Sequence, residues 1–505
     1  MSPKDLKVLF VCAEAAPFAT VGGLAQVAYF LPRALKKLGA DVALFMPKYG
    51  TISEEKYHIE PLLEGLMVPT DAKDGPSELE CNVKVRYGGK WEPTVYFLEN
   101  HEFYEMRGNV YGYKDDPVRF ALLSRGLLEF VRAVDYRPQI IHANDWHTGY
   151  VANYLRRKYE KESEFRAIST VFTIHNLKNQ GVFDFRYASP MDFDDGKSMP
   201  ASLLGETIRK QSALKRGIIY SDLVNTVSES YAREIMTSEY GEGLHDLIKE
   251  LRDKFFGILN GLDYTDFDPS TDHVIKKSFS TKTLAARVEN KIDLQKEFRL
   301  EANPSIPILS YVGRLAEQKG LDLMKEILPS LLNEFPVQVI ILGTGESRYR
   351  DFFANLEKEY PGRVGCHLLA NFTLPRKIFA GTDIILLPSR FEPGGIVVME
   401  GMRYGAVPVV RKTGGLSDIV SDHNPADNIG NGFSFRSYSP LSFFGAVVRA
   451  LEVYKNKKSW YQLVSRVMRE DFSWDKSAIK YLDLYERAIE FRRDRQGSVI
   501  NPTLE

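Results

Sequence analysis

The sequence predicts an α/β protein made of two Rossmann-like, doubly wound domains. Its 505 residues exceed what one hydrophobic core usually supports, and with 44% hydrophobic residues the chain can fill two cores. Short apolar runs bounded by turn residues alternate along the chain with longer amphipathic stretches. This alternation is typical of βαβ units, whose strands form parallel sheets.

The expected strands form two series. The first comprises residues 8–11, 42–46, 140–143, 169–174, 223–226 and 257–259, and the second comprises 308–312, 337–342, 364–368, 384–387 and 407–410. The polar stretch 263–303 between the series is expected to link two domains. We therefore expect a first domain over residues 1–263 and a second over 264–470. A C-terminal helix within 471–495 is expected to return to the first domain.

Composition excludes several classes of partner. Lys and Arg number 66 against 67 Asp and Glu, and no long run carries one sign of charge, so neither nucleic acid nor an anionic membrane is expected. The three cysteines are scattered, which favours a reducing, cytoplasmic compartment. The apolar start of the chain is broken by Glu14, too early for a signal peptide. No stretch approaches the roughly 18 apolar residues of a membrane span.

Two similar glycine segments each follow an expected strand and precede an expected helix. They are Val21-Gly22-Gly23-Leu24 in the first half and Thr413-Gly414-Gly415-Leu416 in the second. Unpaired backbone N–H groups at the start of a helix bind anions. Two such loops, one per domain, suggest a cleft for an anionic ligand, and a simple tight turn remains the alternative for each loop.

The segment from Ser389 to Gly401 follows an apolar strand directly. It contains Glu392, a proline, Gly394 and Gly395, which is typical of a loop that contacts a ligand at the carboxyl end of a parallel strand. Glu400 is expected about two turns into the following helix, where it and Glu392 would face one elongated ligand. A solvated surface pair of glutamates is the alternative.

The turn Gly313 to Leu321 carries two cations, Arg314 and Lys319, ahead of an expected helix. Cations are unfavourable at a helix N-terminus unless an anion joins them, so a diphosphate ligand is expected here. The alternative is that both side chains are exposed and paired with Glu317.

Histidines end two strands of the first half. His147 lies in Asn144-Asp145-Trp146-His147, where it can donate a hydrogen bond to a reacting group or orient a sugar. His175 has a similar setting. A buried structural histidine is the alternative at both positions.

The motifs of this sequence, taken in chain order, resemble those of a known family, the bacterial, archaeal and plant glycogen/starch synthases. The resemblance covers residues 7 to about 485 and rests on Val21–Leu24, Asn144–Gly149, Phe172–Leu177, Gln180–Gly181, Thr226–Ser228, Gly257–Asp263, Gly313–Leu321, Phe391–Gly395, Arg403–Leu416 and Asp471–Trp474. These enzymes are retaining glycosyltransferases of the GT-B fold, in which two Rossmann-like domains face across a cleft.

The resemblance implies roles for individual residues. It places Glu392 on the catalytic carboxylate, Arg314 and Lys319 on the phosphate-binding cations, and His147 on the active-site histidine. It also implies donor-binding residues, which are Gly22, Gly23, Asn260, Gly394, Gly395, Glu400, Thr413, Gly414, Gly415 and Phe372. No metal or other cofactor is expected besides the nucleotide-sugar substrate.

The sequence departs from the family pattern at three places. Thr20 stands where the first glycine loop usually has a phosphate-binding lysine, and Lys178 is a candidate replacement against the alternative of a solvent-exposed lysine. Residues 394–400 look more like the broader group with sucrose- and trehalose-forming enzymes, in which the second glutamate commonly holds the ribose. Ala370 replaces a tyrosine that often stacks on the base, with Phe372 as a possible substitute, so the base is left open.

The expected reaction transfers glucose, with retention, from ADP-glucose or UDP-glucose to the non-reducing 4-hydroxyl of an α-1,4-glucan. The expected partners are thus a nucleotide sugar and a glucan. The sequence does not indicate whether the protein forms oligomers. Two alternatives stay open. One is a transferase with a small sugar or sugar-phosphate acceptor, and the other is a non-catalytic, glucan-binding scaffold.

Overall fold

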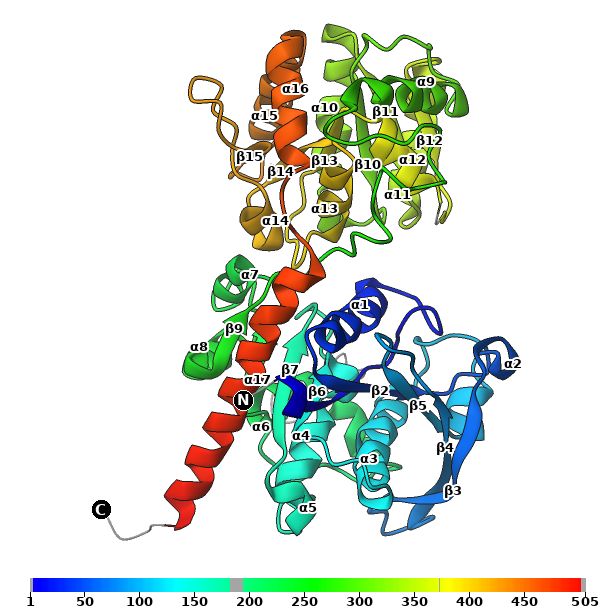
Figure 1. Ribbon diagram of the computed structural model, residues 1–505, viewed down its shortest axis with the longest axis vertical. Coiled ribbons are helices and arrows are strands. Elements are labelled where there is room, and N and C mark those ends of the chain that lie inside the picture. The colour runs from blue at the N-terminus through cyan, green and yellow to red at the C-terminus, as the bar shows by residue number, and fades with distance from the viewer. Residues whose placement is uncertain (1–2, 182–193, 372, 501–505) are drawn as a thin grey trace. The chain divides into compact units, whose positions relative to one another are not determined.

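The computed structural model describes residues 3–181, 194–371 and 373–500. The chain packs into two compact units, coloured by residue number in Figure 1. The first unit comprises Met1–Val227, Ile235–Gly261 and Trp474–Glu505, and the second comprises Ser228–Glu234 and Leu262–Ser473. The chain therefore leaves the first unit twice, once for the short segment 228–234 and once for the long segment 262–473.

The first unit is built on a nine-stranded sheet in the described part of the chain, ordered β3-β4-β5-β2-β1-β6-β7-β8-β9. Its strands are β1 (Lys7–Val11), β2 (Asp41–Pro47), β3 (Glu60–Pro69), β4 (Glu78–Arg86), β5 (Thr94–Glu99), β6 (Ile140–Asn144), β7 (Ser169–Ile174), β8 (Leu223–Thr226) and β9 (Phe255–Gly257). In sheet order, the seven strands β5-β2-β1-β6-β7-β8-β9 pair in parallel. Strand β4 pairs antiparallel with both β3 and β5. The parallel strands β6, β7 and β8 are buried along their whole length.

The second unit has a six-stranded parallel sheet ordered β12-β11-β10-β13-β14-β15 among its described residues. Its strands are β10 (Ile308–Val312), β11 (Gln338–Leu342), β12 (Val364–His367), β13 (Ile384–Leu387), β14 (Val407–Arg411) and β15 (Phe433–Phe435). The chain runs outward from β10 in one direction and then returns to continue from β13 in the other. This is the doubly wound order of a dinucleotide-binding fold, and it creates a switch point between β10 and β13.

Helices connect the strands of both sheets. Those of the first unit are α1 (Gly23–Lys37), α2 (Glu54–Tyr57), α3 (Asp116–Ala133), α4 (Tyr150–Tyr154), α5 (Ser163–Arg166), α6 (Ala213–Tyr220), α8 (His245–Glu250) and α17 (Trp474–Ile500). Those of the second are α7 (Glu229–Glu234), α9 (Arg287–Glu297), α10 (Leu321–Glu334), α11 (Ser347–Glu359), α12 (Leu374–Gly381), α13 (Ile396–Arg403), α14 (Gly414–Ile419), α15 (Pro440–Lys455) and α16 (Lys457–Val467). None of the helices in the described ranges combines the length and apolarity that crossing a membrane requires.

Most expected strands agree with the structure, and the differences have physical causes. The strand expected at 257–259 is wrong by two residues, because β9 ends at Gly257 and the chain turns toward Gly261, where a Cβ would lie 2.6 Å from the backbone nitrogen of Trp474. The strands β3 to β5 and β15 were not predicted. Most of β3 is exposed at the sheet edge, so it carries no apolar alternation.

The stretch 263–303, expected as a link, is packed into the second unit. Its helix α9 contacts α12, and Lys291 on α9 is buried with its Nζ 2.7 Å from Asp383 Oδ2. A buried ammonium is stable only when it is paired and hydrogen-bonded. Pro304 O and Tyr454 Oη accept the remaining hydrogen bonds of Lys291 at 2.9 Å each, so this stretch is an integral part of the unit.

The C-terminal helix α17 packs on the first unit, against α1 and β7. Its Tyr485 Oη lies 2.7 Å from Nδ1 of His142, a fully buried residue of β6. The other ring nitrogen of His142 lies 2.6 Å from Thr173 Oγ1. Burial lowers the pKa of His142 to about 3, so the imidazole is neutral and needs both partners.

We predict that Tyr485→Phe lowers the melting temperature, because it leaves a buried ring nitrogen of His142 unpaired at a cost of about 1–3 kcal/mol. Tyr461→Phe is the matched control, since Tyr461 is 45% exposed. Differential scanning calorimetry of both variants measures the effect. Equal melting temperatures for the two variants would show that α17 is not held to β6 through this hydroxyl.

Candidate active site

The second unit collects its predicted site residues at the switch point of its sheet. Strands β10 and β13 are neighbours, and the loops that follow them contain Lys319 and Glu392 respectively. In open α/β sheets, ligands bind outside the carboxyl ends of the strands at such a point. The local sequence therefore places both side chains where a ligand is expected.

Lys319 and Glu392 form an ion pair, with 2.6 Å between Nζ and Oε2. Ser389 Oγ donates to the same carboxylate oxygen over 3.2 Å. Glu392 is only 8% exposed, so the carboxylate is held in one position by two donors. The alternative of pairing with Glu317 is wrong for Lys319, since Glu317 instead pairs with Arg348 and Arg390.

Hydrogen bonds to backbone carbonyls hold the two loops together. Arg390 N donates to Gln318 O over 2.9 Å, and Gln318 Nε2 donates to Phe391 O over 3.3 Å. Gly320 has φ +70°, and a Cβ there would lie 2.0 Å from Pro388 O, so no other residue fits. The rigid turn 313–321 thus positions Lys319 next to Glu392. Arg314 is exposed, with Nη2 3.3 Å from Gln318 Oε1.

The second glycine loop packs on the Glu392 loop. A Cβ at Gly414 would lie 2.2 Å from Glu392 O, and one at Gly415 would lie 2.7 Å from Gly394. Gly415 N donates to Glu392 O over 2.9 Å, and Gly414 N donates to Glu234 Oε1 over 2.8 Å. These glycines are required by backbone packing, and their N–H groups are bound within the protein.

Glu400 lies little more than one turn into α13, nearer the helix start than predicted. Its carboxyl is buried, which raises its pKa to about 8, and Arg376 opposes this rise only in part. No contact joins Glu400 to Glu392 among the described residues. The two glutamates therefore have different environments, one neutralised by a proton and the other by a lysine.

The first unit gathers its residues in the loops after β1 and β6, which are also neighbouring strands at a switch point. Glu14 follows β1 and is 3% exposed. Its Oε2 accepts from Val21 N over 2.6 Å and from Gly22 N over 3.1 Å. Burial raises the pKa of Glu14, and these two hydrogen bonds oppose the rise. The first glycine loop is therefore also held by a carboxylate of its own chain.

His147 lies in a 3₁₀ turn after β6, with its ring stacked 4.7 Å from that of Tyr111. Its pKa is lowered to about 3, chiefly by burial, with smaller contributions from the neighbouring His175 and Arg119. The imidazole is therefore neutral. Its Nδ1 is buried without a hydrogen-bond partner among the described residues.

Asp145 supports this histidine loop. It has φ +57°, an uncommon conformation for a residue with a side chain, and its Oδ1 accepts from His175 N over 2.7 Å. Burial raises the pKa of Asp145 to about 7. The His175 ring bonds to Asn144 Oδ1 over 2.9 Å, and burial lowers its pKa to about 3, so it shapes the loop as a neutral group.

Other predicted residues have varied settings. Asn260 is buried in the first unit, and its Oδ1 has no hydrogen-bond partner within the described ranges. Thr20 and Lys178 are both exposed. Phe372 lies outside the described residues.

Three residues that contact the site were not singled out from the sequence: Glu14, Tyr111 and Glu234. The only signal for Glu14 is a carboxylate directly after an apolar strand. Nothing local marks Tyr111 or Glu234, because each meets its partner across 36 residues or more of intervening chain.

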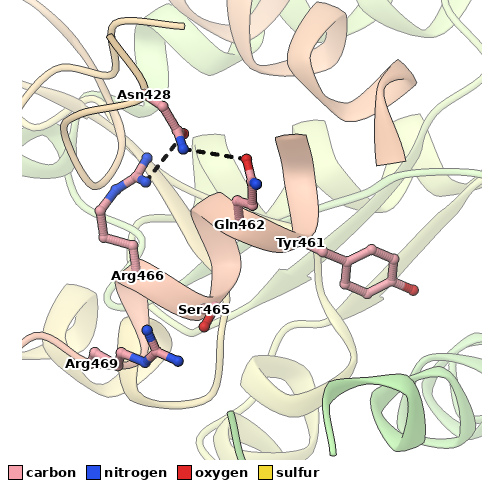
Figure 2. A pocket seen from close by; sticks show the side chains of 6 residues that line it. All are labelled: Asn428, Tyr461, Gln462, Ser465, Arg466 and Arg469. Atoms are coloured by element: carbon pink, nitrogen blue, oxygen red, sulfur yellow. Dashed lines mark hydrogen bonds between the residues drawn. The ribbon is translucent and has the colours of Figure 1, made fainter. Parts of the chain in front are cut away.

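A separate surface cavity of about 460 Å³ lies on the second unit, lined by Asn428, Tyr461, Gln462, Ser465, Arg466 and Arg469. Figure 2 shows Asn428 bonded to Arg466 and Gln462, with the Tyr461 ring pointing away from them. Arg466 also donates to Gly430 O over 2.5 Å. Its guanidinium therefore anchors the loop around residue 430, and no predicted site residue lines this cavity.

Two family models match the chain. Residues 7–250 match the starch synthase catalytic domain, and residues 294–463 match the group 1 glycosyl transferases. The chain is 39% identical to glycogen synthase of Desulforamulus reducens, over 97% of this chain and all of that protein. It is 40% identical to glycogen synthase of Clostridium perfringens, over 96% of this chain and 99% of that one.

Solved structures agree. The catalytic domain of starch synthase IV from Arabidopsis thaliana, bound to ADP and acarbose, matches with a TM-score of 0.83 and 32% identity, over 96% of this chain and 99% of that one. Sucrose-phosphate synthase from Thermosynechococcus elongatus matches with a TM-score of 0.56 and 18% identity, over 95% and 98%, which shows the fold alone.

Fold and family models together define the chain as a glycosyltransferase of the GT-B fold, which confirms the predicted fold class. More closely, it belongs to the glycogen and starch synthase family, as its sequence motifs indicated.

We predict that Glu400→Gln raises the melting temperature increasingly between pH 5 and 8. The folded pKa is about 8 and that of an unfolded glutamate about 4.3. In this interval the unfolded chain has lost the proton and the folded chain retains it, so wild-type stability falls as pH rises. Each unit of pKa difference corresponds to about 1.4 kcal/mol.

Thermal melts from pH 5 to 9 measure the difference, and the exposed Glu250→Gln is the charge-matched control. A constant offset between Glu400→Gln and wild type across this range would contradict the raised pKa.

Proposed function

We propose that this protein transfers glucose, with retention, from a nucleoside-diphosphate glucose to the non-reducing end of an α-1,4-glucan. The observation that carries the proposal is the Lys319–Glu392 pair at the switch point of the second sheet. Family membership supports it, and so does the structural relative, which binds ADP and acarbose. We further propose a cytoplasmic location, since the free cysteines Cys12, Cys81 and Cys366 suit a reducing compartment.

In this proposal, the second unit binds the donor. Breaking the bond to the leaving diphosphate develops negative charge on its oxygens, and preorganised cations stabilise that charge best. Lys319 and the exposed Arg314 lie in one rigid turn after β10, at the edge of the sheet where ligands bind. Glu400 is proposed to receive the ribose hydroxyls.

We assign Glu392 to positioning the glucose and stabilising the positive charge that develops on it. Its carboxylate is already oriented by Lys319 and Ser389, so little reorganisation accompanies the reaction. Lys319 touches both charged groups in this arrangement. It therefore couples the position of Glu392 to that of the diphosphate.

The first unit contributes uncharged groups. Buried polar atoms normally have hydrogen-bond partners, yet His147 Nδ1 and Asn260 Oδ1 have none among the described residues. We propose that sugar hydroxyls supply the missing partners. A sugar hydroxyl both donates and accepts, so it suits a neutral imidazole and an amide oxygen alike.

The proposed donor is ADP-glucose, on the strength of the relative that binds ADP. Incubating the protein with glycogen and either ADP-glucose or UDP-glucose, and measuring the released nucleoside diphosphate, tests both donor and reaction. Release that depends on glycogen supports the proposal. No release with either donor, or release only with a sugar-phosphate acceptor, would contradict it.

We predict that Lys319→Ala and Arg314→Ala each lower kcat by about a hundredfold, because each removes a charge that stabilises the leaving diphosphate, worth on the order of 3 kcal/mol. Glu392→Gln should lower kcat at least as much. Steady-state kinetics with glycogen measures these effects, and circular dichroism checks the fold. Near wild-type turnover in both cation variants would show that the diphosphate binds elsewhere.

Thr20 allows a further prediction. Thr20→Lys is expected to lower the KM for the donor several-fold, because a charge-assisted hydrogen bond is about twice as strong as a neutral one. Donor kinetics of Thr20→Lys and Thr20→Ala measure this. If the lysine raises KM, the site has been rebuilt around the hydroxyl. If neither substitution changes the kinetics, Thr20 does not contact the donor phosphates.

A further inference from the structure

The segment Ser228–Glu234 packs in the second unit, although the chain on both sides of it belongs to the first. It contains α7, which contacts α14 closely. We propose that this segment positions Glu392, and that Glu234 is its principal positioning residue. The inference rests on the role proposed above for Glu392.

The first contact joins the segment directly to the Glu392 loop. Ser228 is buried, and its Oγ donates to Pro393 O over 2.8 Å. Pro393 follows Glu392 in the chain. A hydrogen bond at this carbonyl therefore restrains the peptide next to the residue that carries the proposed catalytic carboxylate.

A second contact joins the segment to α14. Asp418 on α14 accepts from Ser230 N over 2.8 Å and from Ser230 Oγ over 2.5 Å. These bonds use both carboxylate oxygens of Asp418. They attach α7 to α14, the helix that begins in the second glycine loop.

Glu234 makes the third contact of the segment, and we call the three contacts together the clamp. Its Oε1 accepts from Gly414 N over 2.8 Å, and its Oε2 accepts from Thr413 Oγ1 over 3.1 Å. Thr413 is fully buried. Burial raises the pKa of Glu234, these hydrogen bonds and Arg411 lower it, and Asp418 raises it. The carboxylate thus pins the second glycine loop by backbone and side chain together.

The glycine loop transmits this restraint to Glu392. Gly415 N donates to Glu392 O, and the absence of a side chain at Gly414 lets the two backbones touch. Close-packed backbones of this kind move together. A displacement of residues 413–415 would therefore displace Glu392 and alter the 2.6 Å contact with Lys319.

The decisive experiment compares kcat at saturating donor for Glu234→Ala and Glu234→Gln. The alanine variant loses the acceptor of Gly414 N, and we expect kcat to fall about tenfold to a hundredfold, the effect of a small misplacement of a reacting group. The glutamine variant retains an acceptor for Gly414 N, and its amide can donate to Thr413 Oγ1. We therefore expect it to restore kcat to within about threefold of wild type, since it preserves the geometry and removes only the charge.

Glu250→Ala is the matched control, because Glu250 is an exposed glutamate at the end of α8. Thermal melting separates loss of positioning from loss of fold. If Glu234→Ala does not fold, Ser228→Ala tests the same clamp through Pro393 and should lower kcat with little change in donor KM. Wild-type kcat in whichever of these variants folds would overturn the inference.

A different result would identify a different role. If Glu234→Ala leaves kcat unchanged and tightens the binding of ADP, the carboxylate competes with the diphosphate, and the positioning role is wrong. Glu392→Gln separates this inference from the proposed function. An inactive Glu392→Gln with a fully active Glu234→Ala contradicts the inference alone, whereas an active Glu392→Gln contradicts the proposed function.

Discussion

The site in the second unit depends on the close approach of two backbone segments, residues 392–394 and 413–415. Only glycine permits it, since a Cβ at Gly414 would lie 2.2 Å from Glu392 O. The approach lets Gly415 N bond to Glu392 O, while Lys319 arrives from the neighbouring strand β10. Backbone packing against the glycine loop therefore positions Glu392, and the order of the strands positions Lys319 beside it.

Both glycine loops are held by a carboxylate of the chain itself, which is buried in the case of Glu14 and partly buried in the case of Glu234. Glu14 accepts the N–H groups of Val21 and Gly22, and Glu234 accepts that of Gly414. Their shared sequence pattern suggested anion binding, and the anion in each case is a glutamate of the protein itself. Such a carboxylate fixes the loop before substrate arrives, which lowers the cost of ordering it on binding. It also adds negative charge beside the loop. In the first loop, the neutral Thr20 does not offset this charge, as a lysine at that position would.

Sequence predicted best what depends on local pattern. Strands such as Ser169–Ile174 and Ile384–Leu387 are buried on both faces, so they appear as continuous apolar runs. The loops with Lys319 and Glu392 were found because each follows such a run. Glu14 was missed because its partners are backbone N–H groups, which the sequence does not mark. Glu234 was missed because its partners, Thr413 and Gly414, are distant in the sequence. The exposed strand β3 was missed because an edge strand need not alternate.

The electrostatic character of the two units differs in a way that matches the chemistry proposed for them. The groups after β10 and β13 are charged, with Lys319 and Glu392 in direct contact. In the first unit, burial keeps the His147 imidazole neutral and raises the pKa of Asp145 to about 7. A diphosphate leaving group requires charge, whereas a glucan carries none and is recognised by neutral donors and acceptors. In the proposed division of roles, burial that keeps the His147 imidazole neutral suits the first unit to an uncharged sugar.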